Sequence, residues 1–226
     1  MDEIEQGEPT GPRARNRAAV ENRLRAAGRR HLAEHGAAAL SLRAVARDME
    51  IAPSALYRYV RNRDDLLTVL IVDAYDDLAD AIDAAVAERT TPQTRFVAFA
   101  NALRDWALAH PSEYALIYGS PVPGYRAPQE RTNRAGERPL IALAALVSTT
   151  SVPTVAGTDG GIQTAAAQAL QSLGAESATL ARGIAVWNLL LGSVSSELFE
   201  QLGHVTDHQA AVYAGVVDLG AALLFG

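Results

Sequence analysis

The sequence predicts an all-α fold with two domains: an N-terminal three-helix domain that contains a helix-turn-helix, and a larger C-terminal helical bundle, with about nine helices in total. Two observations support this prediction. Apolar residues recur at helical spacing through most of the 226 residues, and no strand-like alternation stands out. Residues that favour helix ends also stand next to these apolar runs. The chain is therefore expected to be helical almost throughout.

The first 60 residues predict three consecutive helices. Gly36 stands where a helix commonly ends in a glycine, and Ser41 can cap the helix that follows. Leu40 and Val45 flank Ser41 at the two positions of a hydrophobic staple. Pro53 suits the first position of a third helix, because its missing N–H costs nothing there.

The rest of the chain predicts six further helices. Asn62 can cap the fourth, so Asp64 and Asp65 fall in its first turn, where the helix dipole favours acidic side chains. These aspartates are therefore expected to start a helix rather than to contact a ligand. The fourth helix is expected to reach about Arg89. The later helices are expected to begin at Thr91-Pro92 and Pro111 and to cover about 137–147, 176–202 and 207–225, with loops rich in Pro or Gly over 119–130 and 148–161.

Charge is distributed unevenly along the chain. The formal net charge is -6, yet residues 13–63 hold twelve arginines against four acidic residues. Residues 64–226 hold eight arginines against eighteen acidic residues. A basic segment on an acidic body favours a polyanionic partner for that segment, with a solvated helix face as the alternative.

Composition argues against several protein classes. The chain has no cysteine, which excludes disulfides and thiolate chemistry and suits a reducing cytoplasm. No run of about 18 apolar residues predicts a membrane span, and the acidic N-terminus lacks the apolar segment of a signal peptide. No Ser-His-Asp grouping or glycine-rich phosphate loop stands out. Neither an enzyme nor a cofactor is therefore expected.

The second and third helices are joined by a short turn, residues 49–52, as in a helix-turn-helix. Ala46 is small enough to let the two helices cross closely, while Leu56 and Val60 can fill the core beneath them. The third helix would enter the major groove, with short residues near its start at the base edges and tyrosine or arginine at phosphates. The residues expected to contact DNA are Ser41, Arg43, Ser54, Ala55, Tyr57, Arg58, Tyr59 and Arg63.

The segment LSLRAVARDMEIAPSALYRYVRNRDDL resembles the DNA-binding domain of TetR-type transcriptional regulators. The likeness covers about residues 15–70, where buried, capping and contact positions match in register. Two residues depart from the family pattern. Glu50 stands where the family usually has Gly, at a turn position where positive φ strains other residues, and Tyr59 replaces the commoner His.

This resemblance implies a sequence-specific regulator of transcription, usually a repressor, that binds a palindromic operator as a homodimer. It also implies a small-molecule effector that binds the C-terminal domain and weakens DNA binding. The effector would favour a state in which the fourth helix swings and the recognition helices separate. The domains are then a disordered acidic tail over 1–14, the DNA-binding domain over 15–62, and a ligand-binding and dimerisation domain over 63–226.

The last two helices are apolar on more than one side, which favours burial in a two-fold interface of four helices. Packing within one chain is the alternative. Small residues such as Ala214 and Gly215 would allow close approach. The residues expected at the dimer interface are Leu190, Val194, Leu198, Val212, Val216, Leu219 and Leu223.

The effector pocket is expected among aromatic residues of the C-terminal domain, with a few polar groups between them. Trp187 and Gly192 also match a Trp-x-x-x-His-Gly signature that the resemblance associates with one subgroup, although Leu191 replaces the His. That replacement favours a more apolar effector. The residues expected to line the pocket are Phe99, Leu103, Trp106, Tyr118, Trp187, Asn188 and Leu191.

Two other hypotheses come from different classes of protein. The chain could be a helical small-molecule binding or scaffold protein whose basic segment does not read an operator. His31, Glu34 and His35 also spell the H-x-x-E-H pattern of one class of zinc peptidase. The structural alternative is that this segment is the last turn of a helix. His31 would then lie in the core, and His35 would stand at the C-terminal end of the helix, where the helix dipole favours a positive charge.

Overall fold

The computed structural model describes residues 11–147, 177–203 and 208–226, and these residues form nine α-helices and one short 3-10 helix. The all-α prediction is confirmed. Two expectations fall outside the described residues: most of the N-terminal tail, and the loop predicted over 148–161. No helix in the described ranges is both long enough and apolar enough to cross a membrane. The elements are α1 (Pro12–His35), η1 (Ala37–Ala39), α2 (Leu42–Asp48), α3 (Pro53–Leu56), α4 (Arg63–Ala87), α5 (Pro92–Ala109), α6 (Pro111–Tyr118), α7 (Gln129–Val147), α9 (Ser177–Leu198) and α10 (Gln209–Phe225).

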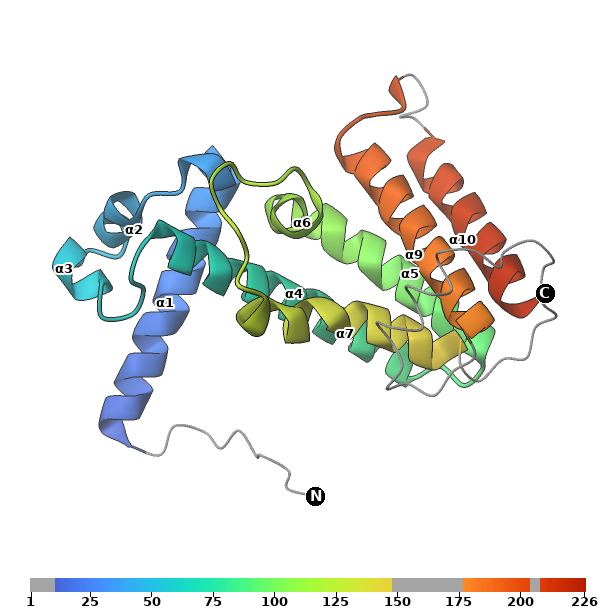
Figure 1. The fold of residues 1–226 in the computed structure, drawn as a ribbon, viewed down its shortest axis with the longest axis horizontal. Coiled ribbons are helices and arrows are strands. Elements are labelled where there is room, and N and C mark those ends of the chain that lie inside the picture. The colour runs from blue at the N-terminus through green and yellow to red at the C-terminus, as the bar shows by residue number, and fades with distance from the viewer. Residues whose placement is uncertain (1–10, 148–176, 204–207) are drawn as a thin grey trace.

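The helices are arranged as a head and a body (Figure 1). The head consists of α1, η1, α2 and α3, and the body consists of the remaining helices. The long helix α4 starts beside α1 and runs into the body, where α5 and α7 pack against it. The pair α9 and α10 lies at the end of the body farthest from α3 (Figure 1). Helix α4 is therefore the structural link between the two parts.

Most helices begin where the sequence predicted, because a local capping contact is present. The Ser41 hydroxyl accepts a hydrogen bond from the Ala44 N–H at 3.5 Å, and the Asn62 side chain accepts one from the Asp65 N–H at 2.8 Å. Thr91 and Thr94 form a reciprocal capping box at the start of α5. Each contact satisfies an N–H group that the helix itself leaves free.

Two helix starts differ from the prediction. Helix α1 begins at Pro12, inside the segment expected to be disordered. Helix α7 begins at Gln129 rather than near residue 137, and it continues through Pro139. The polar start of α7 and its internal proline favoured a later helix start. In the structure, Thr132 and Ala135 of this first half are buried, and α7 packs against α4. Tertiary packing therefore outweighs the local signal.

Two apolar clusters hold the head and the body. The head cluster joins α1, α2 and α3 to the first turns of α4, and Val45, Ala46 and Leu66 in it are completely buried. The body cluster draws on α4, α5, α6, α7, α9 and α10, with Phe96 and Phe99 completely buried at its centre. Because α4 contributes to both clusters, a displacement of α4 would disturb both.

Arginines also tie the neighbouring helices to two faces of α4. On one face, Arg25 and Arg29 of α1 pair with Asp73, and Arg29 also contacts Asp77 at 2.6 Å. These pairs reinforce the apolar contact between head and body, and their partial burial reduces the screening of the charges by solvent.

On the other face, Arg138 of α7 reaches Asp76 at 2.9 Å, Asp80 at 2.7 Å and Asp83 at 3.1 Å. The hydrogen bond with Asp80, helped by those with Asp76 and Asp83, raises the pKa of Arg138, although burial acts in the opposite direction. One guanidinium thereby offsets part of the repulsion among three aspartates on neighbouring turns of α4.

Candidate nucleic-acid interface

The helix-turn-helix is built around a tight turn between α2 and α3. Val45 and Ala46 are completely buried, which brings the two helices close together as predicted. The Ile51 N–H donates to the Ala46 carbonyl at 3.0 Å and closes the turn. Glu50 lies at φ 56, in the left-handed region that the sequence indicated for this position. The turn therefore holds α3 firmly against α2 at the cost of some backbone strain at Glu50.

Helix α3 presents its polar residues outward. Ser54 and Arg58 are exposed, and the Tyr57 side chain is 54% exposed although it is large and partly apolar. Ala55 is half-buried. Tyr59 is also half-buried, because its ring lies beneath the Arg17 guanidinium of α1, 5.9 Å from the ring centroid. Tyr59 is thus partly a packing residue, whereas Ser54, Tyr57 and Arg58 are free to meet a partner.

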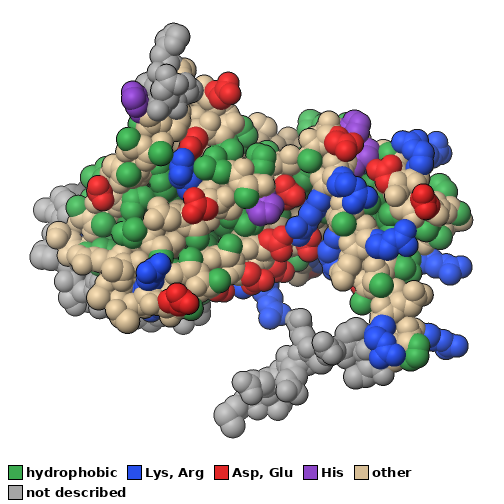
Figure 2. Space-filling model, turned by 180° about the vertical axis from the view of Figure 1, so that it is seen from behind, with side chains coloured by type: hydrophobic (Ala, Val, Ile, Leu, Met, Phe, Trp, Pro, Cys, Tyr) green, Lys and Arg blue, Asp and Glu red, His purple; other side chains and the backbone are tan. Residues whose placement is uncertain are grey.

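Arginines gather over the end of the molecule that the head forms (Figure 2). Arg43 and Arg47 of α2 and Arg58 after α3 are exposed, and within the part of the chain that the structure describes they form no ion pair. Ser41 is half-buried, since its hydroxyl caps α2. Because these arginines beside α3 are exposed and hold no carboxylate within the described residues, they are available to a phosphate backbone.

Arg63 is oriented differently from the prediction. Its guanidinium was expected to stand beside the N–H groups at the start of α4, ready for a phosphate. It instead turns toward η1 and donates from Nη2 to the Ala37 carbonyl at 2.9 Å and the Ala38 carbonyl at 3.0 Å. The reason is that carbonyl groups of η1 lie within its reach. Arg63 therefore links the start of α4 to η1, and a phosphate contact stays a prediction.

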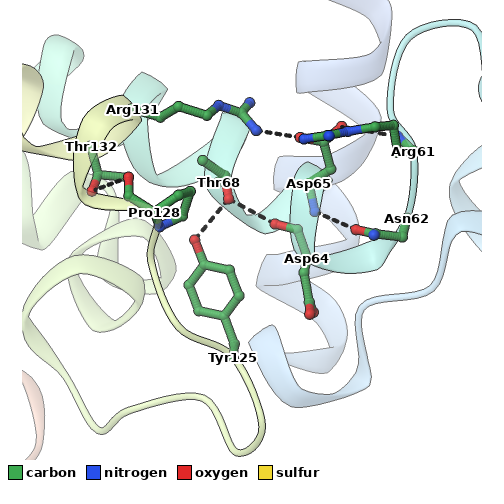
Figure 3. Close-up of polar contacts among 9 residues, drawn as sticks. All are labelled: Arg61, Asn62, Asp64, Asp65, Thr68, Tyr125, Pro128, Arg131 and Thr132. Carbon is green, nitrogen blue, oxygen red and sulfur yellow. Dashed lines mark hydrogen bonds and ion pairs between the residues drawn. The ribbon is translucent and has the colours of Figure 1, made fainter.

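The junction between the head and α4 contains a polar network that sequence reasoning missed (Figure 3). Asp65 accepts a hydrogen bond from the Arg61 N–H at 2.9 Å and also pairs with Arg131 of α7. Burial alone would raise the pKa of Asp65, but the Arg61 N–H and the Arg131 guanidinium lower it to about 2. Asp65 thus does more than begin α4, because it connects α7 to the segment that follows α3.

A second set of hydrogen bonds in this network involves the loop between α6 and α7. The Thr68 hydroxyl donates to the Asp64 carbonyl at 2.8 Å and meets the Tyr125 hydroxyl at 2.9 Å (Figure 3). Because Thr68 has one hydroxyl proton, Tyr125 is the donor in the second bond. The only signal in the sequence for this contact was a single tyrosine in a segment rich in Pro and Gly. The partners of Asp65 and Thr68 are too distant in sequence to be predicted.

The aromatic residues expected to line a pocket form a packed cluster instead. Phe99 meets Trp187 at 6.2 Å between ring centroids, and Tyr118 meets Trp187 at 5.9 Å. Phe99 and Leu103 are completely buried in the body cluster. Leu191, half-buried, packs against the same cluster, and its carbonyl accepts a hydrogen bond from Tyr114.

Two of the expected pocket residues make other contacts. Asn188 is exposed, and its side-chain amide donates to the Ile184 carbonyl at 2.8 Å, so it faces solvent rather than an inner cavity. Trp106 is a buried member of the body cluster, and its ring stacks on His110 with 5.3 Å between ring centroids. Most of the expected set therefore belongs to the core or packs against it, and Asn188 alone of the set faces outward.

Three cavities lie between other elements. The first, of about 750 Å³, is bounded by the end of α1, by η1, by α6 with the loop after it, and by the residues after α9. The second, of about 480 Å³, is a polar groove between α4 and α7 that contains Arg131, Arg134 and Arg138. The third, also about 480 Å³, lies between α4, α6 and α7 and contains Tyr75 and Glu137.

Some of the residues expected at the dimer interface are buried inside the single chain. Leu190 and Val194 are completely buried in the body cluster, so they have no surface to offer a second copy. Leu198, Val212 and Val216 are half-buried, while Leu219 is 52% and Leu223 36% exposed. Leu190 and Val194 are therefore core residues rather than interface residues, because α9 and α10 pack on each other and on the body and leave only part of their apolar surface open.

The H-x-x-E-H segment occupies the last turns of α1. His31 is buried, as predicted for a core residue, and its ring stacks on His35 with 4.5 Å between centroids. Over the described residues, no group of three His, Cys, Asp or Glu side chains could hold a metal ion. His35 forms the exposed end of the helix.

Two family models match this chain. One, described as bacterial regulatory proteins of the tetR family, matches residues 24–70, and one described as a tetracyclin repressor-like C-terminal domain matches residues 96–219. The HTH-type transcriptional regulators Rv1816 of Mycobacterium tuberculosis and Mb1846 of Mycobacterium bovis are each 51% identical over 126 residues, which cover 54% of this chain and 53% of each relative. The chain thus spans about half the length of the curated relatives it matches.

Solved structures agree over nearly the whole chain. The crystal structure of a protein described as regulatory, SCO4313, is 34% identical, covers 93% of this chain and 98% of its own, and superposes with a TM-score of 0.79. A protein from Rhodococcus sp. RHA1 shares the fold at 24% identity, with a TM-score of 0.68 over 92% of this chain and 96% of its own. Together with the two matching domain models, these likenesses show that the chain belongs to the TetR family.

Proposed function

We propose that this chain is a sequence-specific, DNA-binding regulator of transcription, rather than an enzyme, and that it acts as a ligand-responsive homodimeric repressor in the cytoplasm. The observation that carries the proposal is the head surface around α3, where Arg43, Tyr57 and Arg58 are exposed beside a firmly closed turn. Membership of the TetR family supports the same function.

Docking follows from the geometry of the head. The start of α3 carries Ser54 and Ala55, whose short side chains allow the backbone to approach base edges in the major groove. Arg43, at the start of α2, and Tyr57 and Arg58, directly after α3, flank this position and would reach the phosphates on either side. Phosphate contacts of this kind would position the helix, while the short residues would leave room for base readout.

A homodimer would use the open face of α9 and α10. Leu189, Leu219 and Leu223 are exposed there, and Ala214 and Gly215 add no bulk between them. Nothing lies within 4 Å of a side-chain carbon added at Gly215, so that part of α10 is open to a partner helix. Two copies paired on this face would present two α3 helices to a palindromic operator.

A small-molecule effector completes the proposal. The related fold of the regulator FadR from Bacillus subtilis was solved in complex with stearoyl-CoA, at 12% identity and a TM-score of 0.63. A protein with a related fold can therefore hold a ligand. An effector that binds a displaced position of α4 more tightly would weaken DNA binding, because α4 belongs to both apolar clusters.

Selection of bound sequences from random duplexes, followed by salt titration, tests the DNA-binding function. The selected duplex should bind far more tightly than a scrambled one, and its affinity should fall steeply with salt concentration. Tyr57→Ala and Arg58→Ala should each weaken binding, since both residues are exposed on the head. Enrichment of no sequence, with parental binding in both variants, would favour a helical binding protein without operator readout.

Analytical ultracentrifugation tests the dimer. Leu219→Glu places a charge on the proposed interface and should yield monomers. Val97→Glu provides the matched control, because Val97 is 39% exposed on α5, outside the α9–α10 face. A dimer that survives Leu219→Glu, or dissociates equally in Val97→Glu, would refute this interface.

A further inference from the structure

The largest of the three cavities described above lies where the head meets the body. Leu32 and Ala33 of α1 and Ala37 and Ala38 of η1 form its head side. Its body side comes from α6, from the loop that follows α6, and from the residues after α9. Figure 1 shows the loop after α6 passing beside the end of α1. Its volume of about 750 Å³ falls within the range of sites that hold drug-sized molecules.

The lining of this junction cavity indicates the chemistry of an occupant. Among the described residues that line it, none is charged, and the polar side chains are those of Ser112, Ser120 and Gln201. Phe199 also lines it and remains 42% exposed, although its ring packs on Tyr114 of α6 with 6.3 Å between centroids. An apolar ligand would gain by covering Phe199, whereas a charged ligand would lose hydration without finding a counter-charge.

The other cavities differ in this respect. The groove between α4 and α7 is lined by three arginines and two aspartates, and the remaining cavity contains Glu137. In the aromatic cluster of the body, Trp187 contacts both Phe99 and Tyr118. The junction cavity is therefore the described cavity best suited to a neutral, apolar molecule.

The wall of the junction cavity is bonded to the start of α4. Ala37 and Ala38 line the cavity, and their carbonyl oxygens accept the two hydrogen bonds from Arg63. Arg63 is the first residue of α4 and adjoins the segment that follows α3. A molecule that displaced η1 would thus break or redirect the hydrogen bonds of Arg63 and shift α4 relative to the head.

We propose that the junction cavity is the effector site of this regulator, that it takes a neutral and mainly apolar small molecule, and that occupancy weakens DNA binding through η1 and Arg63. This inference rests on the proposed regulatory function, but the binding step is testable by itself. Because both the head and the body line the cavity, the affinity for an occupant depends on how the two are arranged. Coupling between the effector and the operator requires such a difference in affinity.

A pair of dyes that differ in charge tests the binding step. N-phenyl-1-naphthylamine is neutral, while 1-anilinonaphthalene-8-sulfonate carries a sulfonate on a closely similar framework. Fluorescence titration should show at least about tenfold tighter binding of the neutral dye to the parent protein, a difference of about 1.4 kcal/mol. Equal or tighter binding of the sulfonate would overturn the assigned chemistry.

Cavity-filling variants locate the bound dye. Ala33→Phe, from α1, and Ser112→Phe, from α6, should each weaken binding of the neutral dye at least about tenfold. Ala84→Phe is the matched control, because Ala84 is an exposed residue of α4 outside the three cavities, and it should bind as the parent does. Parental binding in both filling variants, each checked for a parental circular-dichroism spectrum, would overturn the site.

DNA binding then separates this proposal from the regulatory function. Saturating neutral dye should weaken operator binding by the parent about threefold or more, and it should have no effect on Ala33→Phe at the same concentration. An unchanged operator affinity in the parent, or an equal loss in Ala33→Phe, would overturn the coupling while leaving operator binding established. A parent that selects no operator would refute the regulatory function itself, whatever the dye titrations show.

Discussion

The arginines of the head and those of the body have opposite surroundings. Arg43 and Arg58 in the head are exposed, with no ion pair in the described part of the chain. Arg104 and Arg138 in the body are each held by carboxylates, at distances down to 2.6 Å for Arg104 and Glu197. The same residue type is thus available to a partner in one region and committed to the fold in the other.

This contrast explains why the net charge of -6 is uninformative about partners. The body carries most of the acidic residues, but aspartates such as Asp73 and Asp76 of α4 are occupied by arginines. Paired charges contribute little to the electrostatic field around the molecule, whereas the unpaired arginines near α3 contribute a positive field. Four substitutions test this contrast between the head and the body.

The largest effect is expected from Arg104→Met in the body. Arg104 forms a bidentate pair with Glu197, and the two side chains are 20% and 12% exposed. Removing the arginine leaves a largely buried carboxylate without its partner. The free energy of unfolding should therefore fall by about 2–4 kcal/mol, measured by urea denaturation.

An exposed pair in the head provides the control for Arg104→Met. Arg17 contacts Glu21 at 2.8 Å, but the Arg17 side chain is 65% exposed, so Arg17→Met should change stability by less than about 1 kcal/mol. The double variant Arg104→Met/Glu197→Leu should regain much of the lost stability. Equal losses from Arg104→Met and Arg17→Met would contradict the contrast between the regions.

The second effect is expected on operator affinity. Arg58→Ala should weaken binding about tenfold, or about 1.4 kcal/mol, and lower the slope of log affinity against log salt by about 1. Its unfolding free energy should stay within about 0.5 kcal/mol of the parent. Arg89→Ala is the control, because Arg89 is exposed beyond the far end of α4, in the body; it should leave operator affinity unchanged.

The third effect concerns the junction between the regions. Asp65→Asn should lower stability by about 1 kcal/mol at pH 7, because the Asp65 carboxylate is stabilised by Arg61 and Arg131. The pKa of Asp65 is depressed from 3.8 to about 2, so the parental advantage is full above about pH 4 and declines as the pH falls toward 2.

Urea denaturation at pH 7, 4 and 3 measures this dependence on pH. Asp64→Asn is the matched control, since Asp64 occupies the same first turn of α4 but is 54% exposed and has no contact with Arg131. The prediction fails if the two variants lose equal stability, or if the loss in Asp65→Asn is as large at pH 3 as at pH 7.

The smallest effect is expected at the turn of the helix-turn-helix. Glu50→Gly should raise stability by about 0.5–1 kcal/mol, because glycine adopts the φ of 56 at this position without strain. Glu50→Gln keeps the strain and removes the charge, so it should not share this gain. A gain in operator affinity in Glu50→Gln alone would show instead that the carboxylate repels DNA.

Much of the head was predictable from local sequence. Ser41, Asn62 and Gly36 act through contacts within a few residues of themselves, and Val45 and Ala46 are buried as their spacing indicated. The body was predicted less well. The sequence did not predict that α7 begins at Gln129 or that Asp65 pairs with Arg131. It also did not distinguish Leu190, which is completely buried, from Leu219, which is 52% exposed.

The helical fold, the order of the helices, the helix-turn-helix and the likeness to the TetR family can be read from the amino-acid sequence, because short-range caps, turns and apolar periodicity encode them. The pairing of the arginines, the burial of the aromatic residues and the position of the junction cavity are visible in the folded chain alone. These features depend on contacts between residues far apart in the chain, and periodicity shows which face of a helix is apolar but not what that face meets.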